Sequence, residues 1–236
     1  MLRRCFHNIP MKNLINGTEP RIVTLSQDSL DTHAKVATEI LLKGQVIATP
    51  TDTIYGIASL ANNYKAIRKL YDIKGRDFSK PVSICVAEIE DIYKWGKVTI
   101  PKELLEELLP GPVTLCFKRQ SKLNPELNPD SDLVGIRIPD YPFIRAVCRH
   151  TKLPLALTSA NPSNSPSTLS IEEFSDLYGH LSGIFDGGQL SLDEKARLGS
   201  TIVDLSDVGF YSLIRAGSAE KLTVEKLNQF GIRPKK

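Results

Sequence analysis

Short apolar runs alternate with stretches of helical spacing along most of this sequence, and this alternation constrains the fold more than any other feature. Residues 30–41 and 66–71 carry apolar side chains three and four apart, which is typical of helices that cover a sheet. Gly44 and Gly75 follow these helices as stop signals, and Asn62 or Asn63 and Ser170 are N-cap candidates. Further helices are expected at 89–95, 104–109, 143–148, 171–178 and 224–230, and strands at 22–25, 45–49, 82–86, 113–117, 133–138, 155–158, 183–185, 201–205 and 211–215. The predicted class is α/β, or α+β, with a mixed sheet.

The 236 residues contain no long linker, internal repeat or low-complexity tract, so we expect one main domain over residues 21–220. Residues 221–236 are expected to form a C-terminal helix and a basic tail. Residues 1–20 are interpreted as a flexible leader or a mitochondrial targeting segment, because Arg3, Arg4 and Lys12 stand there without an acidic residue before Glu19. The expected location is cytoplasmic, and also mitochondrial if the leader is a targeting segment.

Composition excludes several classes of protein. Nothing approaches the ~20 consecutive apolar residues that a membrane span needs. The four cysteines form no CxxC pair and indicate reduced thiols, and the four histidines form no metal-binding pair. A net charge of +3 is weak evidence for a polyanionic partner. The P-loop, dinucleotide-binding and nucleophile-elbow motifs are absent.

Polar clusters follow several predicted strands, where open α/β sheets place their sites. The segment 50–56 (PTDTIYG) and the segment 157–167 could each hold a polar ligand or form an ordinary turn or loop. The cations Lys74, Arg76 and Lys80 suit phosphate groups or, alternatively, a helix C-terminus. The segment 110–114 (PGPVT) is interpreted as a rigid structural turn.

Arg137 stands inside an apolar strand and needs a partner. A substrate carboxylate, or a structural carboxylate such as Asp140 or Asp186, would serve equally well.

Nine elements in this order resemble the YrdC-type threonylcarbamoyl-AMP synthase family in its single-domain form. Each element alone is a weak signal, but together they span about residues 20–218. They are PTDTIYG at 50–56, KGR at 74–76, KP at 80–81, PGPVT at 110–114, GIRIP at 135–139, TSAN at 158–161, PS at 166–167, GSTIVD at 199–204 and IRAGS at 214–218.

The resemblance implies a twisted, open mixed sheet flanked by helices, with a concave basic face. It implies an enzyme that joins L-threonine, bicarbonate and ATP into L-threonylcarbamoyl-AMP and pyrophosphate. The product would pass to a separate tRNA threonylcarbamoyl transferase complex, in the modification of tRNA next to the anticodon. Mg²⁺ would be held by ATP and water rather than by protein side chains. Weak RNA binding is a further expectation.

The resemblance also implies roles for individual residues. Lys74, Arg76, Ser159 and Asn161 match the catalytic set at the nucleotide, where fixed cations and donors would stabilise charge in phosphoryl transfer. Cys85 departs from the family, because many relatives have a histidine there, and 76–80 lacks the usual proline and asparagine. The expected ATP contacts are Lys74, Arg76, Lys80, Ser159, Asn161, Ser167 and Arg215, and the expected threonine contacts are Thr53, Cys85, Arg137, Leu157 and Ser200.

Two other functions remain open from the sequence. One is a non-catalytic RNA-binding or assembly module with the same fold. The other is an enzyme that uses carbamoyl phosphate, as related domains in hydrogenase maturation do, although the zinc-finger cysteines of those long chains are absent here.

Overall fold

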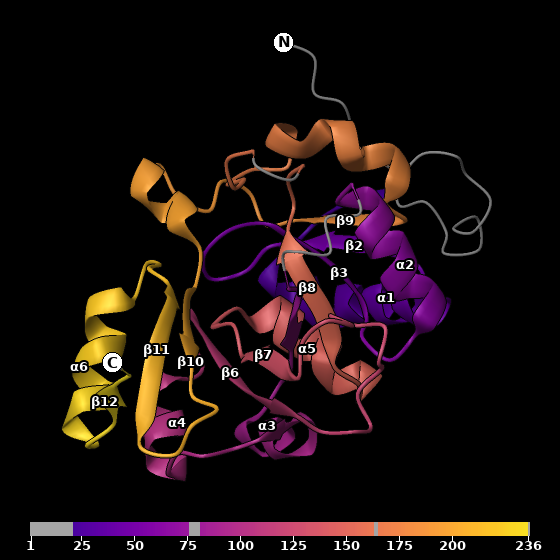
Figure 1. Ribbon diagram of the computed structural model, residues 1–236. Coiled ribbons are helices and arrows are strands. Elements are labelled where there is room, and N and C mark those ends of the chain that lie inside the picture. The colour runs from indigo at the N-terminus through magenta and orange to yellow at the C-terminus, as the bar shows by residue number, and fades with distance from the viewer. Residues whose placement is uncertain (1–20, 76–80, 163–164, 236) are drawn as a thin grey trace.

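The computed structural model describes residues 21–75, 81–162 and 165–235. In this part of the chain the strands form one mixed, twelve-stranded sheet in the order β1-β9-β2-β3-β8-β4-β7-β6-β10-β11-β12, with β5 paired to β6 (Figure 1). The expected leader lies outside the described residues. The predicted α/β fold with an open mixed sheet flanked by helices is confirmed.

Parallel and antiparallel pairs are mixed throughout the sheet. The central strands β3, β8 and β4 are joined by antiparallel ladders, whereas β4–β7 and β6–β10 are parallel pairs. The strands are β1 (Arg21–Thr24), β2 (Ile47–Thr49), β3 (Gly56–Leu60), β4 (Ser83–Cys85), β5 (Gly96–Lys97), β6 (Val113–Arg119), β7 (Leu133–Arg137), β8 (Leu155–Ser159), β9 (Gly183–Asp186), β10 (Thr201–Asp204), β11 (Phe210–Arg215) and β12 (Arg233–Pro234).

Local signals explain where several helices begin and end. The Asn63 side chain accepts a hydrogen bond from the Ala66 amide and caps α2, and Gly44 and Gly75 follow their helices with φ values of 71° and 77°. The α-helices are α1 (Leu30–Leu42), α2 (Tyr64–Ile73), α3 (Ile89–Trp95), α4 (Lys102–Leu108), α5 (Pro142–Thr151) and α6 (Glu220–Gln229), and the 3₁₀-helices are η2 (Gln27–Ser29), η3 (Glu172–His180) and η4 (Glu194–Leu198). Among the described residues, no helix is both long and apolar enough to cross a membrane.

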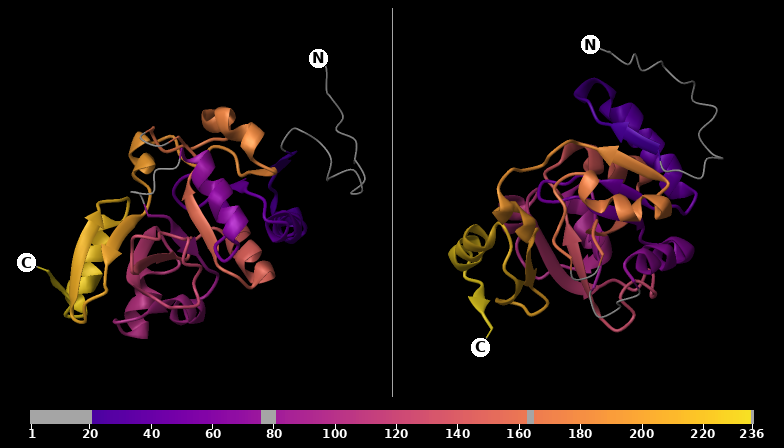
Figure 2. Two further views of the ribbon diagram at one scale, coloured as in Figure 1. Left: turned by 45° about the vertical axis from the view of Figure 1, so that its right-hand side comes forward. Right: turned by 90° about the horizontal axis from the view of Figure 1, so that it is seen from above.

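Helices cover both faces of the sheet. Successive strand residues point to opposite faces, so apolar residues on each face need a covering layer. Ile84 packs into an apolar core with α2, α3, α4 and α6, while its neighbour Cys85 packs into a second core with α1 and α5. Figure 2 shows α1 and α6 at opposite ends of the molecule, as the strand order requires. The register of β4 with β7 and β8 places Ser83, Arg137 and Leu157 on the same face as Cys85, beside the α1–α5 layer. The part of this face that lies beside the α1–α5 layer carries the polar side chains of Ser83 and Arg137.

Two expectations from the sequence were wrong. Strand β3 was not predicted, nor were the two-residue strands β5 and β12, the latter within the expected basic tail. The helix expected at 171–178 is the 3₁₀-helix η3, with Ile171 rather than Ser170 at its N-cap. Phe174 breaks helical geometry inside η3 with a φ of −127°, and its ring lies 5.5 Å from that of Tyr55. The Phe174 ring therefore packs against Tyr55 where the backbone leaves helical geometry. The amphipathic pattern of the sequence predicts a regular helix there and does not indicate this break.

Candidate functional site

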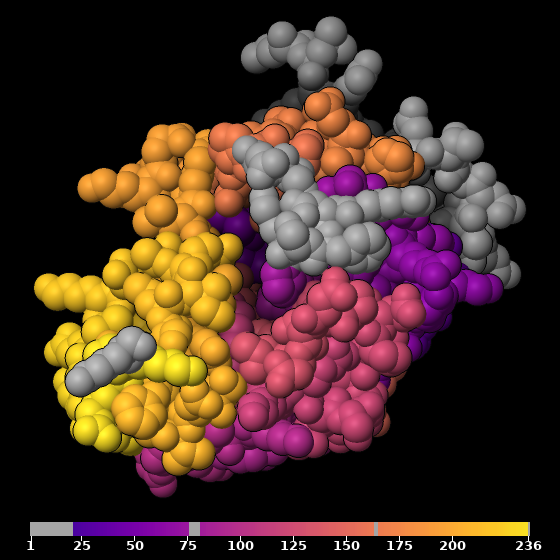
Figure 3. Space-filling view, viewed as in Figure 1, coloured from indigo at the N-terminus to yellow at the C-terminus, as the bar shows by residue number. Residues whose placement is uncertain are grey.

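A polar pocket opens on the sheet face beside α1 and α5. Residues from β3, β4, β6, β7, β8, β10 and β11 contribute to its wall, together with the loop between β2 and β3. Figure 3 shows the surface hollowed where the C-terminal strands meet the middle of the chain. The lining residues are Thr51, Ile54, Tyr55, Gly56, Pro81, Ser83, Thr114, Arg137, Leu157, Thr158, Ser159, Ser167, Ser200, Ile202 and Arg215.

Lys74 joins the end of α2 to the end of β8. Its Nζ donates to the Ser159 carbonyl at 2.9 Å, to Asn161 Oδ1 at 3.1 Å and to the Asn161 carbonyl, and lies 3.4 Å from Ser159 Oγ. Helix α2 stops at Ile73, so the side chain at the helix end can cross to the loop after β8. The structure thus brings together three of the four predicted catalytic residues, while Arg76 lies outside the described residues.

Arg137 is buried at the end of β7 and is paired with Asp52. Its Nη2 donates to Asp52 Oδ1 and, at 2.8 Å, to Thr53 Oγ1. The Thr51 hydroxyl in turn donates to the Ile54 carbonyl at 2.8 Å and holds the PTDTIYG segment in a compact turn. The structural carboxylate beside Arg137 is therefore Asp52, and neither Asp140 nor Asp186 takes that place. Asp186 instead accepts hydrogen bonds from the Tyr55 hydroxyl and the Gly188 amide.

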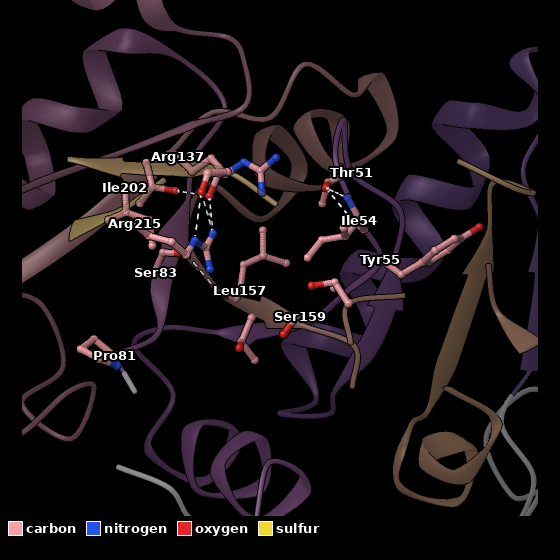
Figure 4. A pocket seen from close by; sticks show the side chains of 15 residues that line it. Thr51, Ile54, Tyr55, Pro81, Ser83, Arg137, Leu157, Ser159, Ile202 and Arg215 are labelled. Carbon is pink, nitrogen blue, oxygen red and sulfur yellow. Dashed lines mark hydrogen bonds between the residues drawn. The ribbon is translucent and has the colours of Figure 1, made fainter. Parts of the chain in front are cut away.

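A second guanidinium group lies on the same side of the pocket. Arg215 donates to the Ser200 carbonyl at 2.7 Å and lies 3.1 Å from Ser200 Oγ, which is 2.9 Å from Thr114 Oγ1. The residue is exposed as a whole, but partial desolvation of its guanidinium group lowers the pKa of Arg215, and the charge of Arg137 lowers it further. An arginine remains charged despite such a shift, so two cations face this part of the pocket (Figure 4).

The other predicted site residues occupy different positions. Leu157, Ser167 and Ser200 line the pocket, whereas Lys80 lies outside the described residues. Cys85 is fully buried in the core beneath α5, with its sulfur 3.6 Å from that of Cys148. It does not line the pocket.

Sequence reasoning missed several lining residues. Thr114 belongs to PGPVT, which was interpreted as a structural turn, and Ser83 follows Pro81 in a three-residue strand. Thr51 belongs to the PTDTIYG segment and lines the pocket as well, which the resemblance did not imply. Strand register is what identifies Thr114, because the antiparallel ladder that pairs Leu115 with Ile136 brings the preceding Thr114 next to Arg137.

The chemistry of the pocket is that of an anion site. Guanidinium groups and hydroxyls line it, and Ile54, Leu157 and Ile202 add apolar surface. Among the described residues, no group of three or more His, Cys, Asp or Glu side chains is placed to hold a metal ion. Such an arrangement can bind phosphate or carboxylate groups next to an apolar moiety.

Comparison with known proteins gives a consistent result. The chain is 46% identical over 203 residues to a mouse protein named threonylcarbamoyl-AMP synthase, with 85% of this chain and 72% of that protein covered. A Bacillus subtilis protein of the same name is 32% identical over 86% of this chain, which spans 58% of that protein. The crystal structure of Pyrococcus abyssi Sua5 complexed with L-threonine matches with a TM-score of 0.77 and 27% identity, covering 91% of this chain and 62% of that one.

One family profile accounts for most of the described fold. The profile of the Sua5/YciO/YrdC family, described as "Telomere recombination", matches residues 39–217. This match runs from α1 to the turn after β11 and includes every residue that lines the pocket. The chain belongs to the Sua5/YciO/YrdC family.

Proposed function

We propose that this protein is a threonylcarbamoyl-AMP synthase, which converts L-threonine, bicarbonate and ATP into L-threonylcarbamoyl-AMP, pyrophosphate and water. The observation that carries the proposal is the meeting of Lys74, Ser159 and Asn161 beside a pocket that also presents Arg137 and Arg215. The names of the mouse and Bacillus subtilis relatives support it. We further propose that the product serves a transferase complex that modifies tRNA.

The nucleotide half of the reaction suits the Lys74 side of the pocket. When a carbamate oxygen attacks the α-phosphorus of ATP and pyrophosphate leaves, negative charge grows on the phosphate oxygens. Cations and hydroxyls already held in place stabilise such charge without having to reorganise. Lys74, Ser159 and Asn161 are the proposed catalytic residues, joined by Arg76, and Lys80, Ser167 and Arg215 are proposed to complete the ATP contacts.

The amino-acid half suits the side of Arg137. A guanidinium group binds a carboxylate strongly when both are withdrawn from water. We propose that Arg137 holds the carboxylate of L-threonine, with Thr53, Leu157 and Ser200 beside it. The fully buried position of Cys85 gives it an indirect influence on this site, by packing next to Arg137 in the adjacent strand.

A magnesium ion would find its ligands mainly on the substrate. Side chains that line the pocket offer hydroxyls and cations rather than carboxylates, and the nearby Asp52 is already paired with Arg137. Mg²⁺ would therefore be held by phosphate oxygens and water, where it would offset phosphate charge. The protein side chains proposed above would bind ATP and L-threonine directly.

The test is pyrophosphate release from ATP and bicarbonate, with and without L-threonine, and with L-serine and glycine as comparisons. Release that requires L-threonine is the expected result. Folded protein that releases no pyrophosphate with any amino acid, yet binds tRNA with an affinity that falls steeply with salt, would contradict the proposal and favour the RNA-binding module. AMP formation that requires carbamoyl phosphate would favour the third function instead.

Replacement of one catalytic residue gives a sharper test. We expect Lys74→Ala to lower the rate of threonine-dependent pyrophosphate release by ~10²–10³, the usual loss when one preorganised electrostatic group is removed. Lys65→Met is the matched control, because Lys65 is an exposed lysine of the same helix. Circular dichroism would verify that both variants fold. Full activity of folded Lys74→Ala would contradict the role of Lys74.

A further inference from the structure

The buried ion pair between Asp52 and Arg137 is the least compensated polar contact beside the pocket. The two side chains are 10% and 6% exposed, and only Nη2 and Oδ1 join them. Among the described residues, Asp52 Oδ2 and Arg137 Nε have no hydrogen-bond partner although both atoms are buried. A guanidinium group and a carboxylate can form two parallel hydrogen bonds, and here they form one. Structural stabilisation alone does not explain this arrangement, because a buried pair stabilises best when all its polar atoms are satisfied.

The geometry fixes the direction of Arg137. Both hydrogen bonds of the guanidinium group, to Asp52 Oδ1 and to Thr53 Oγ1, use the same nitrogen, Nη2. Since Asp52 and Thr53 belong to one compact turn, they hold this nitrogen together. Nη1 has no acceptor among the described residues, and Arg137 lines the pocket. A ligand can thus be bound by a guanidinium group whose orientation is already set.

The charge balance points to a second consequence. On the Arg137 side of the pocket, one carboxylate, Asp52, accompanies the guanidinium groups of Arg137 and of Arg215, which is also a proposed ATP contact. These three side chains together carry one positive charge in excess, before the separate charge of Lys74 is counted. A single excess charge matches a monoanion such as an amino-acid carboxylate. Two uncompensated guanidinium groups at a partly desolvated site would attract doubly charged anions more strongly.

We propose that Asp52 is a positioning and specificity-determining residue of this pocket. It orients Arg137 toward the carboxylate of the amino acid, and its negative charge disfavours divalent inorganic anions at the same place. The proposal rests on the proposed function, because it takes Arg137 to be the carboxylate-binding residue.

Asp52→Asn tests both parts at once, since asparagine keeps the size and one acceptor oxygen but removes the charge. The KM for L-threonine should rise by about ten- to hundred-fold, as expected for a hydrogen bond between charged groups, while the KM for ATP stays close to that of the wild type. Inhibition by sulfate, measured as competition with L-threonine, should become stronger. A merely structural defect would weaken threonine and sulfate binding together, so a parallel loss would overturn the proposal.

Two further variants complete the experiment. Asp52→Glu keeps the charge but displaces it, so its KM for L-threonine should rise while its sensitivity to sulfate stays that of the wild type. This variant decides the question if Asp52→Asn does not fold, and an unchanged KM in Asp52→Glu would then overturn the proposal. Asp140→Asn is the control, because Asp140 is an exposed carboxylate three residues after Arg137. Wild-type protein that fails to release pyrophosphate with L-threonine would refute the proposed function itself, whereas an active wild type with an unaffected Asp52→Asn would refute only the role of Asp52.

Discussion

A charged side chain inside an apolar strand needs a partner, and Arg137 shows how far a sequence can define that partner. The need itself follows from the cost of burying an unpaired charge. The identity of the partner does not, because Asp52 and Arg137 are 85 residues apart and meet only after the order β3-β8-β4-β7 is established. Asp140 is much closer along the chain, yet it faces solvent.

Cys116 gives a prediction about pH at the residue scale. Burial, followed by the nearby charge of Asp204, raises the pKa of the Cys116 thiol to about 12. A raised pKa means that the reactive thiolate is scarce below that value, so iodoacetamide should label Cys116 very slowly at pH 8 in the native protein. Mass spectrometry after labelling, with and without urea, measures this. Labelling of Cys116 as fast in buffer as in urea would contradict the assignment.

At the scale of elements, the sequence predicted strands and helices best where one face of the element is buried. Helix α3 was predicted with its observed bounds, Ile89–Trp95. Strand β3 was missed because Gly56–Leu60 contains glycine, alanine and serine rather than a run of β-branched or aromatic residues, and because burial of all five residues leaves no alternation to mark it. It also follows directly after PTDTIY, whose polar residues are typical of a loop, so no polar boundary separates the loop from the strand. The motifs predicted the position of the candidate site. Other residues of the pocket wall, such as Ser83 and Thr114, reach it only through the register of β4 and β6 with their neighbouring strands, which the motifs do not show.

Arg197 links the segment containing η4 to the pocket rim. Arg197 pairs with Glu173 at 2.6 Å and with Glu194 at 2.5 Å, and it donates to the carbonyl of the pocket residue Ser167 at 2.7 Å. We expect Arg197→Gln to speed proteolytic cleavage between residues 187 and 200, because partly exposed ion pairs contribute only ~0–1 kcal/mol to global stability but can hold a segment locally.

Limited proteolysis of the folded protein would measure the effect of Arg197→Gln, with the thermal midpoint recorded in parallel. Arg149→Gln is the control, since Arg149 of α5 pairs with Glu88 at the start of α3, away from η4. A cleavage pattern identical to that of the wild type would show that Arg197 does not hold this segment.

At the scale of the whole molecule, α6 is part of the main core rather than an appendage. Leu227 of α6 is fully buried in the core that also contains α2, α3 and α4, and Lys226 pairs with Glu107 of α4 at 2.7 Å. The sequence indicated a helix here, but its attachment depends on apolar contacts between segments more than 100 residues apart, which a pattern along the chain does not encode.

Leu227→Ala should therefore destabilise the entire protein. Loss of a fully buried leucine side chain costs ~2–5 kcal/mol in the free energy of unfolding. Urea denaturation would measure this loss, and the activity per folded molecule should stay unchanged because Leu227 does not line the pocket. The exposed Leu222 of the same helix provides the matched control, and an equal loss of stability in Leu222→Ala would contradict the assignment of Leu227 to the core.

The pocket draws its wall from residues as distant as Thr51 and Arg215, and this distribution has a consequence for biosynthesis. As the chain leaves the ribosome, the segments that carry Thr51 and Arg137 emerge long before β10 and β11. Strand β1 must also wait for β9, its partner about 160 residues later. Such long-range pairing delays folding. A nascent chain that has not yet released β11 lacks Arg215 and so cannot close the pocket, which means that substrate binding begins only after β11 has emerged.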